Sequence, residues 1–216
     1  MNPRPSGNKW RKLKYNLIEA SRQRHQQLLT FGGAYSNHIA ATAAAGKEFG
    51  FKTVGVIRGE RTELLNPTLA FAERQGMRLK FIDRTTYRNK DQLDFLASLR
   101  KMMGAFFHLP EGGSNQLATK GTAEIIKELE SQMSSPPTHI CVACGTGGTI
   151  AGIINASRDT TKIIGFPALK GDFMKAEIEA LLEAPKENWT LNHDYHFGGY
   201  ATVSYTHLTL PTTPYV

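Results

Sequence analysis

The segment Cys144-Gly145-Thr146-Gly147-Gly148-Thr149 follows one apolar stretch and precedes another, which predicts a junction between a strand and a helix. Glycines at such a junction let backbone N–H groups converge on a ligand, and the helix N-terminus favours negative charge. A dinucleotide fingerprint would need glycine at Ile150, and a Walker loop would need lysine at Ile153. We therefore expect an isolated phosphate monoester to bind here. The alternative is a glycine turn that only packs the helix on the strand.

A second segment, Ser6-Gly7-Asn8-Lys9-Trp10-Arg11-Lys12, contains lysine amines that can form a Schiff base with an aldehyde. A lysine that forms a Schiff base must be held in place and kept partly unprotonated, which burial and neighbouring cations both promote. Arg11 and Lys12 are the expected cations. Lys12 lies one helical turn beyond Lys9, so the two side chains share a face and can serve an aldehyde and a phosphate of one cofactor. A basic run on a helix is also typical of a solvated face, which remains the alternative.

The third segment is Tyr35-Ser36-Asn37-His38, between an apolar stretch and an alanine-rich one. Ser36 or Asn37 can simply cap the following helix. Helix N-termini also favour carboxylates, so the same position suits an amino-acid substrate. His38 can then orient that carboxylate or transfer a proton.

The composition of the chain excludes several classes of function and partner. The chain has 216 residues, 40% of them hydrophobic, and a formal charge of +7. The excess lies mostly in the first 24 residues, and no nucleic-acid docking motif accompanies it, so we expect no nucleic-acid partner. Only Cys141 and Cys144 are cysteines, which implies no disulfide framework, and the cytoplasm is the default compartment. Their CxxC spacing lacks a second ligand pair, so we expect no metal, and the apolar runs are too short for a membrane span.

The elements that must position these segments alternate between helix and strand. Helices are predicted over 9–24, from Ser36 or Asn37 to Gly46 or Gly50, and over 66–75, 90–102, 122–132 and 150–157. Strands are predicted over 28–31, 52–57, 79–82, 139–143 and 162–166, with a turn-rich break at 111–115 that can mark a domain crossing. This alternation predicts an α/β fold with parallel sheets. Residues 202–216 continue no such pattern, and we expect them to be a non-native tail.

Together and in this order, these segments resemble the pyridoxal-phosphate enzymes of the tryptophan-synthase β fold, specifically the D-cysteine desulfhydrase and 1-aminocyclopropane-1-carboxylate deaminase family. The resemblance covers roughly residues 6–201 and includes Pro110-Glu111-Gly112-Gly113-Ser114-Asn115 and His196-Phe197-Gly198-Gly199-Tyr200-Ala201. It implies fold type II, with two αβα domains built on parallel sheets. The small domain would be residues 14–110. Residues 1–13 and 111–201 would form part of the large cofactor-binding domain, which would be incomplete at both ends.

The resemblance also implies residue roles. Lys9 would hold pyridoxal 5'-phosphate covalently, Lys12 and the loop residues Cys144, Gly145, Thr146, Gly147, Gly148 and Thr149 would bind its phosphate, and Asn37 would bond its 3-hydroxyl. Ser36 would be the acid/base or nucleophilic residue, and Ser36, Asn37 and His38 would contact the substrate. His38 favours desulfhydrase-like chemistry. The tyrosine near the substrate and the partner of the pyridine nitrogen are not found in this sequence.

The implied reaction releases ammonia and a 2-oxo acid from a small amino acid, in an enzyme expected to be a homodimer at full length. The alternatives are a related enzyme that acts on serine or threonine, a racemase, and an inactive phosphate-binding fragment.

Overall fold

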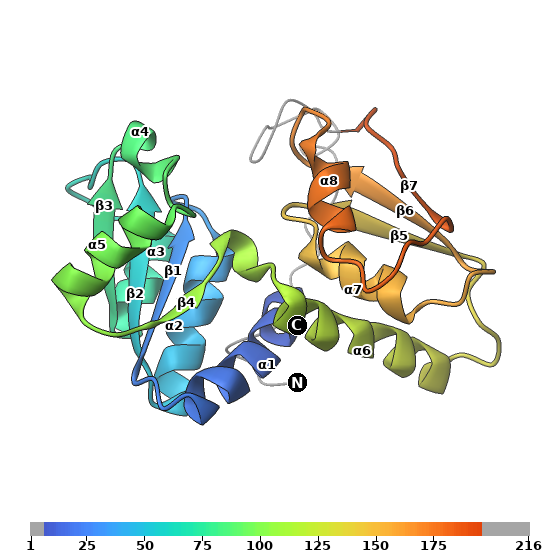
Figure 1. Ribbon diagram of the computed structural model, residues 1–216, viewed down its shortest axis with the longest axis horizontal. Coiled ribbons are helices and arrows are strands. Elements are labelled where there is room, and N and C mark those ends of the chain that lie inside the picture. The colour runs from blue at the N-terminus through green and yellow to red at the C-terminus, as the bar shows by residue number, and fades with distance from the viewer. Residues whose placement is uncertain (1–6, 196–216) are drawn as a thin grey trace.

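The computed structural model describes residues 7–195, in which strands and helices alternate to form two separate parallel sheets (Figure 1). The predicted α/β fold with parallel sheets is confirmed. One sheet has four strands in the order β3-β2-β1-β4, and the other has three in the order β5-β6-β7. The motif at 196–201, the tail at 202–216 and Ser6 lie outside the described residues.

The four-stranded sheet is formed by β1 (Gln27–Gly32), β2 (Lys52–Arg58), β3 (Met77–Ile82) and β4 (Phe107–Leu109), connected through α2 (Asn37–Phe49), α3 (Pro67–Arg74), α4 (Arg84–Tyr87) and α5 (Leu93–Met103). The second sheet is formed by β5 (His139–Cys144), β6 (Lys162–Pro167) and β7 (Trp189–Leu191), together with α7 (Gly148–Ala156) and α8 (Phe173–Glu179). Helix α1 (Gly7–Arg22) and the short 3-10 turn η1 (Glu111–Gly113) lie between the two sheets, and helix α6 (Gln116–Gln132) runs from there alongside α7 (Figure 1).

The first sheet is parallel and is buried on both faces by its crossover helices. Five of the six residues of β1 are buried, as expected for a strand covered by helices on both sides. One face packs against α5, and its core includes Phe31, Val56 and Leu99. The pairing of β1 with β4 places Thr30 opposite Leu109, so the carboxyl ends of these two strands meet at one edge of the sheet.

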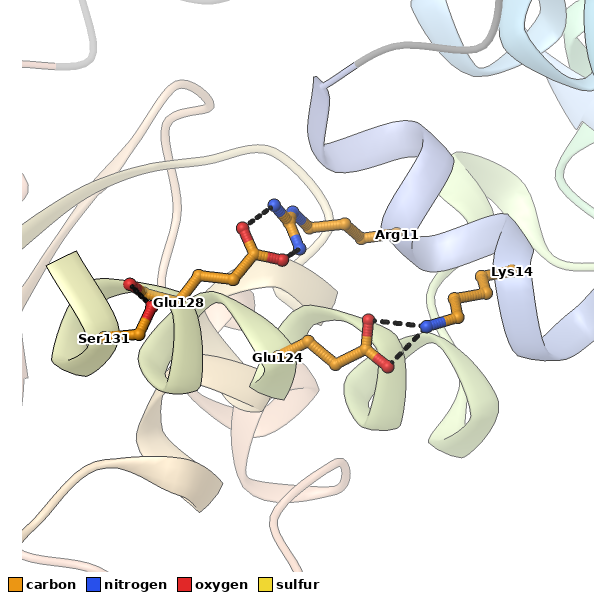
Figure 2. A network of polar contacts seen from close by, with 5 residues as sticks. All are labelled: Arg11, Lys14, Glu124, Glu128 and Ser131. Carbon is orange, nitrogen blue, oxygen red and sulfur yellow. Dashed lines mark hydrogen bonds and ion pairs between the residues drawn. The ribbon is translucent and has the colours of Figure 1, made fainter. Parts of the chain in front are cut away.

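Helix α1 contacts both halves of the chain. Leu13 and Leu17 are buried in a cluster with residues of β1, α2 and β4. On another face, Arg11 and Lys14 form ion pairs with Glu128 and Glu124 of α6, as Figure 2 shows. The domain boundary expected between residues 13 and 14 therefore falls inside a continuous helix that belongs to neither sheet alone.

The close approach of α1 and α6 depends on a glycine. A Cβ atom added at Gly121 of α6 would overlap the backbone carbonyl oxygen of Arg11 and lie 2.8 Å from its carbonyl carbon. The sequence prediction began α6 at residue 122, whereas the helix begins at Gln116 with the side chain of Asn115 accepting from the N–H of Ala118 at 2.9 Å. The prediction was wrong because residues 116–121 have little apolar periodicity and contain this glycine.

Four short elements were not predicted from the sequence: α4, β4, α8 and β7. β4 and β7 have three residues each, too few for an alternating pattern to show. The helix predicted over 90–102 begins at Leu93, and the helix predicted over 150–157 begins at Gly148. None of the helices within residues 7–195 is both long and apolar enough to cross a bilayer.

Candidate active site

A small pocket opens where the start of α1 meets the end of β5. The lining comes from two parts of the chain more than a hundred residues apart: Asn8, Lys9, Lys12, Ala143, Cys144, Gly145, Thr146, Gly147, Thr149 and Ile150. The structure thus brings both candidate lysines and the glycine loop to one place.

The glycine loop joins β5 to α7, as its sequence predicted. Gly147 has a φ of 71°, in the left-handed region that favours glycine, and α7 begins at the next residue. A Cβ atom at Gly148 would lie 2.6 Å from the hydroxyl of Ser114 and 3.1 Å from Nζ of Lys12. Only glycine therefore lets the start of α7 approach Lys12 this closely.

Lys12 is the most unusual side chain of the pocket, because it is a lysine with only 2% exposure. Its ammonium donates to the carbonyl of Gly112 at 3.1 Å, to Ser114 Oγ at 2.9 Å and to Thr146 Oγ1 at 3.2 Å. All three acceptors are neutral, and no carboxylate within residues 7–195 forms an ion pair with Lys12. Burial, and then the nearby charge of Lys9, lower the pKa of Lys12 well below its ordinary value.

Lys9 lies one turn earlier on the same face of α1, and its ammonium donates to the carbonyl of Gly112 at 3.4 Å. Burial lowers the pKa of Lys9, which increases the unprotonated fraction that a nucleophilic amine needs. The expectation that Arg11 would help was wrong. Its guanidinium turns away to α6, where it makes a bidentate contact with Glu128 at 2.7 and 2.6 Å (Figure 2).

Several pocket residues were missed by sequence reasoning. Asn8, which was not among the predicted site residues, donates from its side chain to Thr149 Oγ1 at 3.0 Å and so connects α1 to the glycine loop. Gly112 and Ser114 belong to the segment 110–115, for which no role was predicted from the sequence. The hydroxyls of Ser114 and Thr146 lie 2.7 Å apart, beside Lys12. The signal available in the sequence was the paired glycine followed by serine at 112–114.

The segment Ser36-Asn37-His38 does not line this pocket; it lies at the start of α2, after β1. Oγ of Ser36 accepts from the N–H of Ile39 at 3.3 Å and caps the helix, while Asn37 is exposed. β1 and β4 are adjacent strands with different onward connections, and ligands of open α/β sheets bind at such switch points. Gly112 and Gly113 follow β4, so this helix end and the lysine pocket share the η1 segment as a common wall.

His38 is 1% exposed, and its ring packs against Gly113 of the η1 segment. A Cβ atom at Gly113 would lie 2.7 Å from Cε1 of His38 and 3.1 Å from Nδ1. Burial, and then the charges of Lys9 and Lys12, lower the pKa of His38 well below its ordinary value, so the ring is neutral near pH 7. Contact between His38 and a substrate stays a prediction.

The two cysteines of the CxxC spacing differ in their surroundings. Cys141 is exposed, whereas Cys144 is buried, and its thiol donates to the carbonyl of Val142 at 3.3 Å. Burial raises the pKa of Cys144 to about 11, which disfavours the thiolate that redox chemistry or metal binding needs. Within residues 7–195, no group of three or more His, Cys, Asp or Glu side chains is placed to hold a metal ion.

The pocket provides hydrogen-bond donors for one small anion, and the amine of Lys9 lies beside them. A buried ammonium without a counter-ion is costly, and a phosphate at the Gly145–Thr149 loop would supply that counter-ion while the start of α7 adds its dipole. Lys9 then lies on the same helix face, ready for an aldehyde carbon on the same small molecule. The residues therefore fit a phosphate ester that carries a reactive carbonyl group.

Comparison with known proteins agrees with this chemistry. The family described as pyridoxal-phosphate dependent enzyme matches residues 1–193. The bifunctional D-cysteine desulfhydrase/1-aminocyclopropane-1-carboxylate deaminase of Arabidopsis thaliana is 32% identical over 162 residues, which cover 68% of this chain and 40% of that protein. A D-cysteine desulfhydrase of Klebsiella pneumoniae is 27% identical over 216 residues, covering 91% of this chain and 66% of that one.

Among solved structures, that of an ACC deaminase homologue superposes with a TM-score of 0.76 and 26% identity, covering 91% of this chain and 64% of that chain. The chain thus spans only about two fifths to two thirds of the length of these relatives. On the match over residues 1–193, the chain belongs to the pyridoxal-phosphate dependent enzyme family, with its homologues in the ACC deaminase and D-cysteine desulfhydrase group.

Proposed function

We propose that this chain is the cofactor-binding part of a lyase or deaminase that acts on a small amino acid and releases ammonia and a 2-oxo acid. The observation that carries the proposal is the convergence of Lys9, the buried Lys12 and the glycine loop on one pocket. A phosphate-binding module would need the loop and Lys12 alone. It would not explain a second lysine, with a lowered pKa, on the same helix face.

The anion half of the site would be formed by Lys12 and the glycine loop. Nζ of Lys12 and the hydroxyl of Thr146 are already 3.2 Å apart, and both can turn toward a phosphate oxygen. The N–H of Gly148 already donates to the carbonyl of Thr146 at 2.8 Å, so the next N–H groups of α7 would be the donors to the phosphate. Together these donors would fix one end of pyridoxal 5'-phosphate and so decide where its aldehyde lies.

The amine half would be Lys9, whose Nζ would hold the cofactor at its aldehyde end and would accept and return a proton next to the substrate. When bound, pyridoxal phosphate supplies an electron sink for breaking bonds at the α-carbon of the substrate. The lowered pKa of Lys9 suits both tasks, because a base works best when its pKa is near the working pH. Burial is the cause of this shift, so the same walls that exclude water also tune the amine.

The substrate would enter at the start of α2. The exposed Asn37 and the helix N-terminus would receive its carboxylate or the ring hydroxyl of the cofactor. Ser36 Oγ accepts from Ile39, which leaves its own hydrogen free to be donated to a reacting atom. Both roles rest on the position of this helix end across η1 from the lysines.

The test is to add pyridoxal 5'-phosphate to the purified 216-residue chain and to record its visible absorption band. We expect a band that Lys9→Ala abolishes and that Lys12→Ala shifts to higher cofactor concentrations. Lys14→Ala is the matched control, because Lys14 lies on the same helix but pairs with Glu124, away from the pocket. A folded wild-type chain that gives no band, or a Lys9→Ala variant that keeps it, would refute the proposal.

The substrate class is tested separately, with a chain extended to the length of the relatives. Sulfide, ammonia and 2-oxo acid release is measured with D- and L-cysteine, 1-aminocyclopropane-1-carboxylate, and L-serine. We expect turnover of D-cysteine or of the cyclopropane amino acid. Turnover of L-serine alone would contradict the assignment to this group.

A further inference from the structure

Thr30 lies in the middle of β1, fully buried, and has no part in the reaction outlined above. Its hydroxyl oxygen is 2.9 Å from Nε2 of His38 and 3.0 Å from the backbone carbonyl oxygen of Leu109. It therefore joins the neighbouring strand β4 to the first turn of α2. Both of these elements lead directly into the site.

The hydrogens of this contact can be assigned by counting. Thr30 has one hydroxyl hydrogen, and the carbonyl of Leu109 can only accept. If that hydrogen pointed at His38, two lone pairs would face each other across the 3.0 Å contact with Leu109. The hydroxyl therefore donates to Leu109, and its lone pair accepts from an N–H at Nε2 of His38.

A neutral imidazole carries one N–H, so this hydrogen on Nε2 leaves Nδ1 of His38 unprotonated. Nδ1 is buried and has no hydrogen-bond partner within residues 7–195. It faces Gly113, whose φ of 68° and closeness to the ring exclude a side chain there. The preceding carbonyl, that of Gly112, is the one that accepts from both Lys9 and Lys12.

The tautomer matters because two lysine charges lie near the ring. An unprotonated Nδ1 turns the negative end of the imidazole dipole toward Gly113 and the lysines beyond it. The tautomer with its hydrogen on Nδ1 would bury an N–H group against Gly113 without an acceptor. That N–H would also point toward the positive charges of Lys9 and Lys12. Fixing the hydrogen on Nε2 therefore keeps the ring, the wall and the Gly112 carbonyl in one arrangement.

We propose that Thr30 is a positioning residue of the site: its hydroxyl holds His38 as the Nε2–H tautomer, and through the ring it sets the Gly112 carbonyl that receives Lys9 and Lys12. The tautomer does not depend on the proposed function. The effect on cofactor binding does rest on it.

The first measurement is ¹⁵N NMR of histidine-labelled, cofactor-free chain, with His38 assigned among the seven histidines by comparison with His38→Gln. We expect a neutral ring with its hydrogen on Nε2. Thr30→Val, which keeps the shape but loses the hydroxyl, should redistribute that hydrogen. Thr30→Ser, which keeps the hydroxyl, should restore the wild-type spectrum.

The second measurement is the dissociation constant of pyridoxal 5'-phosphate for the same variants. We expect an increase of about five-fold in Thr30→Val, the change that corresponds to one net hydrogen bond, and wild-type affinity in Thr30→Ser. A wild-type ring with its hydrogen on Nδ1 overturns the proposal without any variant. So does Thr30→Val with both the tautomer and the affinity of wild type. A folded wild type that binds no cofactor refutes the proposed function instead, and leaves the tautomer result standing.

Discussion

Replacing Gly121 by alanine tests whether the contact between α1 and α6 holds the lysines in place. The added Cβ would overlap the carbonyl oxygen of Arg11 and lie 2.8 Å from its carbonyl carbon, while ordinary contact begins at 3.4 Å. The obstacle is backbone, which cannot rotate aside as a side chain does. Helix α1 must therefore retreat by at least about 0.6 Å, and further to clear the oxygen.

The energy follows from two opposing effects. Overpacking of this kind costs typically about 1–3 kcal/mol, and alanine recovers about 1 kcal/mol of helix propensity relative to glycine. We expect a net loss of up to about 2 kcal/mol in the free energy of unfolding. The bond from Lys9 to Gly112 is already long at 3.4 Å, so the same retreat should weaken cofactor binding by about ten-fold.

Urea unfolding followed by circular dichroism measures the first effect, and titration of the visible cofactor band measures the second. Lys127→Ala, on the exposed face of the same helix, is the control and should change neither by more than about 0.5 kcal/mol. A Gly121→Ala variant that is more stable than wild type, as propensity alone would make it, would show that the two helices do not meet as described.

The remaining predictions concern charge, space and reactivity. The folded-state pKa of Lys12 lies below its ordinary value of 10.5, so the unfolded chain binds more protons between the two values, and the stability of the cofactor-free protein should rise with pH there. Lys12→Met should flatten that rise in pH-dependent unfolding curves. Gly148→Ala should weaken inorganic phosphate binding by about ten-fold in ³¹P titrations while the fold survives, because only side-chain atoms face the new methyl group. Under iodoacetamide at about pH 8, mass spectrometry should find Cys141 alkylated well before Cys144; equal rates would contradict the buried, high-pKa thiol.

Local patterns were enough to predict much of the fold and part of the site. Alternating helices and strands indicated the parallel α/β class, and a glycine run between two apolar stretches indicated the junction of β5 and α7. The helical spacing of Lys9 and Lys12 indicated a shared face, and both do reach Gly112. These features depend on residues close together in the chain, where periodicity and turn chemistry act.

Features decided by distant partners escaped the sequence. Arg11 lies two residues from Lys9 in sequence, yet its direction is set by Glu128, which the fold brings to the other side of α1. Thr30 resembles an ordinary strand residue until His38 and Leu109 are placed around it. Gly112 contributes only a backbone carbonyl, which no residue-type pattern can reveal. The roles of Ser36, Asn37 and His38 toward a ligand stay predictions.

The described chain passes from the first sheet to the second through the η1 segment, which follows β4 and precedes α6. The carbonyl of Gly112 in this segment accepts from both Lys9 and Lys12. The covalent link between the two sheets is therefore also the hydrogen-bond acceptor of the two lysines, so a substitution that shifts this link should change cofactor affinity even where it leaves both lysines in place.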